Sequence, residues 1–154
     1  MENEKIISQL VDIYYENEWW HNERLSRPEA HKYHDKLLSA GNIITVSDGD
    51  ILAGYVEYWR LSFEQFGRII CGEPFSAMHE DVSTGQIAYV ANTFIREEYR
   101  NSSVAKQLRD RFLRINEQCT HFAGTALRKS SQPIKVFKKE KIYGWRKKDR
   151  DNAI

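Results

Sequence analysis

The chain has 154 residues, of which 41% are hydrophobic and 29% are charged, and its formal net charge is +1. This length and composition predict one globular domain, residues 1–154, with a sizeable core, and they exclude a disordered chain. No apolar run is long enough to cross a bilayer and the first residues are polar, so we expect no membrane partner and a cytoplasmic location. The cysteines, Cys71 and Cys119, lack metal-ligand spacing, which predicts a reduced protein without a metal site.

The first part of the chain predicts two helices. Residues 3–18 carry apolar side chains at helical spacing and indicate an amphipathic helix, which runs into a segment rich in aromatic rings. A second helix is expected after Ser26, a residue type typical of N-caps, and it should end at Gly41. His31 and His34 lie within this helix, and we expect both at the surface.

A β-hairpin is predicted next. Residues 42–46 and 51–61 are rich in β-branched and apolar residues, and residues 47–50 between them contain the turn signal Asp-Gly. Residues 62–84 follow no period, because glycine and proline interrupt their apolar positions. We interpret this segment as an insertion that forms a substrate-specific loop.

The most informative stretch begins at Ile87. Residues 87–95 are a nearly unbroken apolar run, which predicts a strand buried on both faces. A polar link, residues 96–102, leads into apolar residues at helical spacing over 104–115. This order leaves backbone N–H groups unpaired at the positive end of a helix, which favours a phosphate-binding site. Residues 120–127 then predict a second short buried strand.

Around this loop the residues F-I-R-E-E-Y-R-N-S-S-V-A-K-Q-L resemble the acetyl-CoA motif of the GNAT superfamily of N-acetyltransferases, in which an acidic-aromatic pair precedes R/Q-x-x-G-x-G/A. The six places of the motif are filled by Arg100, Asn101, Ser102, Ser103, Val104 and Ala105. Ser103 stands where the family usually has glycine. A serine there lets the backbone approach a pyrophosphate if its φ is negative, and it is disfavoured if the site needs a positive φ.

The resemblance implies a fold and a reaction. The fold is α/β (α+β), a mixed central β-sheet flanked by helices on both sides. The implied activity is acetyl-CoA-dependent N-acetylation by direct transfer to an amine, carried by a small molecule or a protein, with the chain acting as a monomer or homodimer. Residues 130–142 resemble the family's last helix, with Phe137 where tyrosine is common.

The resemblance also implies which residues bind the cofactor acetyl-CoA. Arg100 is the first residue of the motif. The backbone N–H groups of the residues that follow, 101–106 with Lys106 as the last, would bind the pyrophosphate. The strand end would pair its backbone with the pantetheine arm like an added strand, and one N–H group would polarise the thioester carbonyl. That strand end consists of Thr93, Phe94 and Ile95.

Catalysis needs a base for the amine, and two carboxylates are candidates. Glu57 lies in the second run of the predicted hairpin, and Glu80 precedes the apolar strand. Asn92 could orient a water molecule. The tyrosine acid of the family has no counterpart at Phe137, and Tyr143 is the nearest substitute. Three aromatic residues near the first helix are candidates for the wall of the acceptor pocket: Tyr15, Trp19 and Trp20.

Two alternatives stay open at this point. The departures at Ser103 and Phe137 also fit a degenerate module that binds coenzyme A or a protein and catalyses nothing. Residues 128–150 hold ten Lys and Arg residues against Glu140 and Asp149, which suggests an anionic partner for the C-terminal part. Nucleic acid is a possible partner there, but it is not favoured, because the pI of about 7.8 lies below the usual range of nucleic-acid domains.

Overall fold

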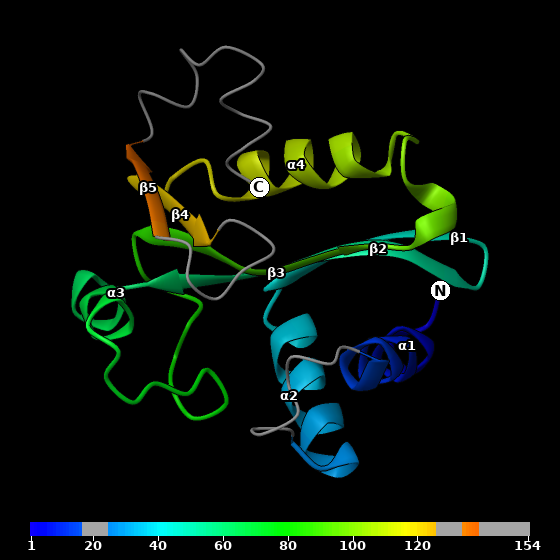
Figure 1. Cartoon of the computed structure of the whole chain (residues 1–154), viewed down its shortest axis with the longest axis horizontal. Helices are drawn as coiled ribbons and strands as arrows, with labels where there is room; N and C mark the ends of the chain where they lie inside the picture. The colour runs from blue at the N-terminus through cyan, green and yellow to red at the C-terminus, as the bar shows by residue number, and fades with distance from the viewer. Residues whose placement is uncertain (17–24, 126–133, 139–154) are drawn as a thin grey trace.

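The protein is built around one mixed, twisted sheet (Figure 1). The structure is a computed structural model, and it describes residues 1–16, 25–125 and 134–138. The strands are in sequence order across the sheet, and only the third and fourth are parallel. Their bounds are β1 Ile43–Asp48, β2 Ile51–Leu61, β3 Ile87–Ile95, β4 His121–Thr125 and β5 Ile134–Lys138.

Helices cover both faces of this sheet (Figure 1). One face packs against α1 (Asn3–Glu16), α2 (Arg27–Ser39) and, through Phe66, the short α3 (Phe63–Ile70). The other face packs against α4 (Val104–Ile115), and a 3₁₀ turn, η2 (Glu97–Tyr99), precedes that helix. The expected mixed sheet with helices on both sides is confirmed.

Local sequence signals explain most of the element boundaries. The Ser26 hydroxyl accepts a hydrogen bond from the backbone N–H of Glu29 and so caps α2. The β1–β2 hairpin turns at Gly49, whose φ of 59° is in the left-handed region that glycine adopts without strain. The helix α3 was missed in the sequence, although Ser62 and Gln65 form a full capping box at its start.

A β-bulge in β3 distorts the middle of the sheet. Asn92 pairs with Glu57, whereas Val90 pairs with Tyr58, so Ala91 is an extra residue with no partner on β2. Ala91 and Asn92 consequently line the same cavity although they are adjacent in the chain. The prediction of a strand buried on both faces holds for residues 87–90, while residues 91–95 are only half-buried.

The structure corrects two predictions. Residues 134–138 form the strand β5, antiparallel to β4, and not part of a last helix; the β-branched Ile134 and Val136 favour a strand that continues the sheet beyond β4. The comparison of Phe137 with a helical tyrosine therefore fails. His34 is buried and not at the surface, because it follows Ala30 by one turn on the face of α2 that packs inward.

Candidate functional site

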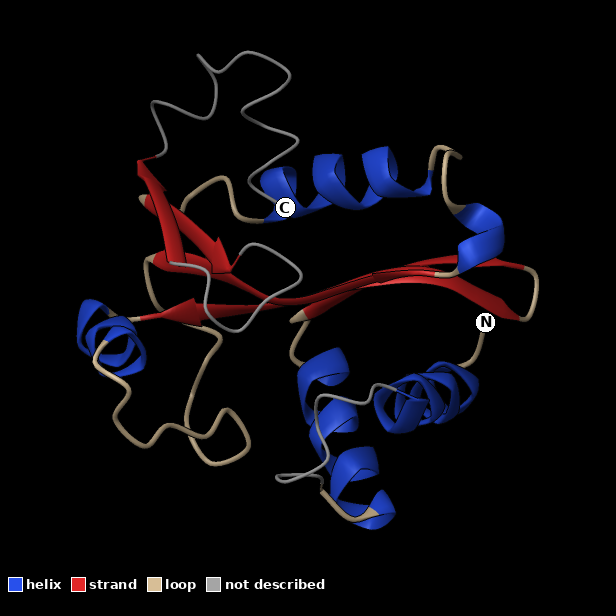
Figure 2. Cartoon of the chain, viewed as in Figure 1, coloured by secondary structure: helices blue, strands red, loops and turns tan. Residues whose placement is uncertain are grey.

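The strands β3 and β4 separate partway along β3. Their pairing runs from Ile87 with His121 to Val90 with Gly124, and residues 91–95 have no partner on β4. We call these four pairs the β3–β4 seam. In Figure 2, β4 and β5 lie above the ribbon of the first three strands. Beyond the seam, the β4-facing backbone groups of β3 lack a ladder partner within the described residues, so an extended ligand can pair with them.

The side chains beyond the seam alternate between the two faces. The Phe94 ring stacks on Tyr55 with centroids 5.9 Å apart, whereas Ile95 packs in the core cluster under α4. The Thr93 hydroxyl oxygen is buried and has no hydrogen-bond partner within the described part of the chain. A buried polar atom without a partner is rare in proteins and indicates a position where a ligand or water completes the structure.

The loop after β3 presents unpaired backbone donors at the start of α4. Among the described residues, the N–H groups of Ser103, Ala105 and Lys106 have no acceptor. No side chain caps the helix at Ser103. These N–H groups and the positive end of the α4 dipole suit a phosphate group.

The backbone conformation at Ser103 does not require glycine. Its φ is −76°, which serine adopts without strain. The one positive φ in the loop, 65°, belongs to Asn101, a residue type that tolerates the left-handed region. The close approach needing glycine lies instead at Gly54, where an added Cβ would meet the Phe94 carbonyl oxygen at 2.8 Å and the Val104 side chain at 3.0 Å.

The other predicted residues of the loop are mostly exposed. Val104 is buried and anchors the helix start in the core. Arg100, Asn101 and Ser102 are exposed, as is Lys106, whose Nζ lies 2.7 Å from a carboxylate oxygen of Asp110. The loop therefore offers backbone groups, more than fixed side chains, to a ligand.

Glu57 lies on the opposite face of the sheet, in the wall of a cavity of about 320 Å³. It is only 6% exposed. The Tyr33 hydroxyl donates to Oε2 of Glu57 at 2.9 Å, and Nε1–H of Trp59 donates to the same oxygen at 3.1 Å. Burial raises the pKa of the Glu57 carboxyl to about 7, although these two hydrogen bonds act to lower it.

The cavity that contains Glu57 also reaches the bulge in β3. Ala91 and Asn92 line it, and the Asn92 amide donates to the Tyr55 hydroxyl at 3.0 Å. His34 also lines it; Nδ1–H of its ring donates to the Ala30 carbonyl, and burial lowers the His34 pKa. The histidine is therefore neutral at neutral pH, and Glu57 is the one acid among the described residues of the cavity wall.

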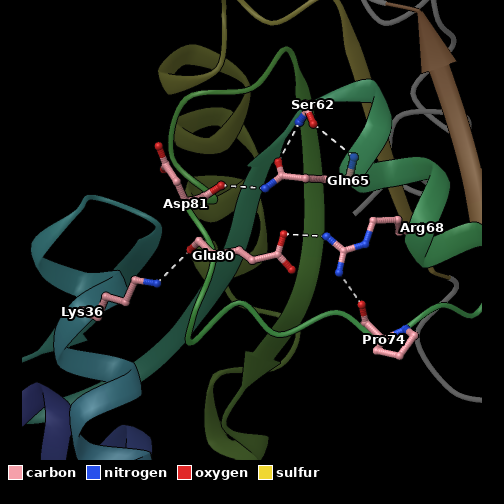
Figure 3. A network of polar contacts seen from close by, with 7 residues as sticks. All are labelled: Lys36, Ser62, Gln65, Arg68, Pro74, Glu80 and Asp81. Carbon is pink, nitrogen blue, oxygen red and sulfur yellow. Dashed lines mark hydrogen bonds and ion pairs between the residues drawn. The ribbon is translucent and has the colours of Figure 1, made fainter.

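A network of polar contacts holds the remaining wall, which comes from the loop between α3 and β3 (Figure 3). Lys36 of α2 donates to the carbonyl oxygens of Ala77, Met78 and Glu80 at 2.8–3.0 Å. The Glu80 carboxylate pairs with Arg68 of α3 at 2.8 Å. Glu80 does not line the cavity of Glu57, so the structure separates the two candidate bases.

Several predicted positions lie elsewhere. Tyr143, Trp19 and Trp20 lie outside the described residues, as does most of the basic segment 128–150. Tyr15 donates to the Leu25 carbonyl and packs its ring under Arg27, and it does not line the cavity.

Sequence reasoning did not connect most of the cavity wall with Glu57, including Tyr33, Trp59 and Phe75. One signal was available for Trp59, because residues two apart on a strand share a face and Glu57 precedes it by two. Tyr33 and Phe75 reach the cavity from α2 and from the loop before β3, and no local pattern connects those segments with β2.

Two kinds of feature are absent from the described residues. No group of three or more His, Cys, Asp or Glu side chains there is arranged to hold a metal ion. Within the same ranges, no helix is both long and apolar enough to span a membrane.

Comparison with known proteins shows the fold. No family model and no curated protein matches the chain. The loading GNATL domain of CurA from Lyngbya majuscula is similar in structure, with a TM-score of 0.53 and 14% identity over 81% of this chain and 63% of that chain. A predicted acetyltransferase with acetyl-CoA from Clostridium acetobutylicum matches at a TM-score of 0.45 and 15% identity, over 76% of this chain and 71% of that chain. The chain thus has a divergent GNAT fold and spans less than two thirds of the CurA domain.

Proposed function

We propose that the protein is an acetyl-CoA-dependent N-acetyltransferase that transfers the acetyl group directly to an amine. One observation carries the proposal. The cavity of Glu57, a buried carboxyl with a pKa of about 7, reaches the bulge where β3 leaves β4. A general base poised near neutral pH is what deprotonation of an amine requires.

The residues on the α4 side fit the cofactor. The unpaired N–H groups of Ser103, Ala105 and Lys106 suit its pyrophosphate, with Arg100 and Asn101 leading into them. The open backbone of Thr93, Phe94 and Ile95 suits the amide-bearing pantetheine arm. The unpartnered hydroxyl of Thr93 is one further polar group that a ligand in this gap would satisfy. Bound acetyl-CoA would supply an activated thioester carbonyl.

The chain's own residues would then move one proton. Tyr33 and Trp59 hold Oε2 of Glu57 and so fix the orientation of the carboxylate. The ionised Glu57 accepts the proton that the amine loses when its nitrogen forms the new C–N bond, and the C–S bond breaks with its electron pair on sulfur. A thiol has a pKa near 8.5, so the thiolate is a fair leaving group even without an acid at Tyr143. Glu80, paired with Arg68, is assigned no catalytic role.

Calorimetry followed by mass spectrometry tests this proposal. We expect acetyl-CoA to bind with a micromolar dissociation constant, and an amine mixture incubated with protein and acetyl-CoA to contain acetylated products. Binding without any transfer would favour the degenerate binding module. Absence of acetyl-CoA binding would refute the proposal altogether.

A further inference from the structure

Half of the residues that line the cavity beside Glu57 carry aromatic rings. Two of its rings come from α2, one from α1 and three from the sheet and the loop before β3. They belong to Tyr14, Tyr33, His34, Trp59, Phe75 and Tyr89. The Trp59 ring lies between two of the others, with its centroid 5.5 Å from that of Phe75 and 5.5 Å from that of Tyr89. Such walls present rigid apolar surface and the electron-rich faces of rings.

The charge of this wall selects one kind of ligand. Among the described lining residues there is one carboxyl, Glu57, and neither lysine nor arginine. A ligand with one positive charge finds one partner there. A polyamine or an aminoglycoside would bring further positive charges without acidic partners, and a carboxylate or phosphate would bring a negative charge next to Glu57. Unpaired charges are costly in a desolvated site.

The hydrogen bonds of the cavity wall also favour an amine as the ligand. The donors nearest the carboxylate, Tyr33 O–H and Trp59 Nε1–H, are both used on Oε2 of Glu57. Oε1 accepts no hydrogen bond from the described residues. The wall therefore offers an acceptor at this point, and the ligand has to supply the donor. An ammonium or amine group does so, and ring faces within about 6 Å would add cation–π attraction.

Building on the proposed function, we propose that the acceptor is a small molecule with one primary amine on an apolar or aromatic body and with no anionic group. The cavity volume of about 320 Å³ is at the lower end for small-molecule pockets, which start near 300 Å³. The side chain of a protein lysine would bring five non-hydrogen atoms and leave roughly half of this space empty, at about 30 Å³ per water-sized group.

Four matched probes test the inference: phenethylamine, phenylalanine, spermidine and a lysine-containing peptide amide. Phenylalanine differs from phenethylamine only by a carboxylate. We expect phenethylamine to be acetylated with a kcat/KM at least tenfold above each of the others. Faster acetylation of any of the other three would overturn the inference while upholding acetyl transfer itself.

Calorimetry with phenethylamine alone separates the inference from the proposed function. Binding of phenethylamine but not of phenylalanine would support the acceptor class even if no acetyl transfer were detected. Equal binding of both, or binding of neither, would refute it.

Two ring variants locate the binding site. Phe75→Leu removes one aromatic wall without touching Glu57, and a lost cation–π contact predicts a KM for phenethylamine raised roughly twofold to thirtyfold. Phe63→Leu is the matched control, because the Phe63 ring is 60% exposed and lies outside the cavity. An unchanged KM in Phe75→Leu, with its fold confirmed by circular dichroism, would contradict the assignment of these rings to the acceptor.

Discussion

The two faces of β3 present two different kinds of site. On the α4 face, the donors are backbone N–H groups of consecutive residues, such as Ser103, Ala105 and Lys106, and they are exposed. On the opposite face, Glu57 is buried and takes its hydrogen bonds from side chains of α2 and β2. The first site depends on the path of the chain, and the second depends on which side chains fill positions far apart in the sequence.

This difference predicts how each face responds to mutation. A site made of backbone groups tolerates many side chains, which explains why Ser103 can stand where a glycine is usual. A site made of one buried carboxyl and its two donors does not tolerate replacement. Variants on one face should therefore leave the function of the other face unchanged.

The largest effect is expected for Glu57→Gln. If Glu57 is the general base as proposed, its removal should lower kcat roughly 10²-fold to 10⁴-fold. The dissociation constant for acetyl-CoA should stay within about twofold, because the proposed cofactor site lies on the other face. Steady-state kinetics and calorimetry measure the two quantities. Glu64→Gln on the exposed side of α3 is the control. If Glu57→Gln kept the kcat of the unchanged protein, Glu57 would not be the base, and the two faces would not differ in the proposed way.

The next effect concerns pH and stability. The Glu57 pKa is about 7 in the folded protein and near 4.5 when unperturbed, so the unfolded state loses this proton first as pH rises. The free energy of unfolding, relative to Glu57→Gln, should be highest below about 4.5 and fall by on the order of 3 kcal/mol up to about 7, then level off. Denaturant unfolding of both proteins across this range measures the difference. A difference independent of pH would show that folding does not shift the Glu57 pKa.

On the α4 face, Ser103→Asp should weaken the binding of acetyl-CoA without lowering the stability of the fold. A carboxylate at this position repels a pyrophosphate, and the affinity for acetyl-CoA should fall roughly tenfold to hundredfold. The same carboxylate complements the helix dipole, so the melting temperature should hold or rise. Ser103→Asn, which has nearly the same shape as Asp but no charge, is the matched control. If Ser103→Asp left the affinity for acetyl-CoA unchanged, the cofactor would have to bind somewhere other than this loop.

The smallest effect is expected for Lys36→Met, which keeps the length of the side chain but removes its three hydrogen bonds to the loop before β3. At this exposed position we expect a loss of about 1 kcal/mol in the free energy of unfolding. The acceptor KM should rise severalfold because that loop forms part of the cavity wall, and the affinity for acetyl-CoA should not change. Lys32→Met, on the same helix, controls for the lost charge. A change in cofactor affinity alone would contradict the division between the faces.

The parts of the molecule that the sequence predicted well are those set by contiguous residues. The strand at residues 87–95, the loop and α4 follow from local periodicity and polarity, and the caps of α2 follow from Ser26 and Gly41. The sequence also identifies Glu57 as a candidate base, beside Glu80. What separates those two carboxylates is burial, and burial is decided by how distant segments pack.

The failures have the same origin. The sequence analysis places His34 at the surface, but its position one turn after Ala30 puts it on the inward face of α2. The family resemblance predicts a helix where β5 lies, although the β-branched Ile134 and Val136 favour a strand. Pairing with β4, which no local pattern reports, decides the conformation of that segment.

The short seam between β3 and β4 also bears on how the native state opens. Four residue pairs join β4 to β3, whereas β1 pairs with β2 along its whole length. A segment that few residue pairs join to the rest of the protein opens at a lower free-energy cost, and it opens as a cooperative unit. We therefore expect β4 and β5 to exchange their amide hydrogens with solvent ahead of the β1–β2 hairpin, so that one molecule contains a slowly exchanging part and a rapidly exchanging part on either side of the same gap.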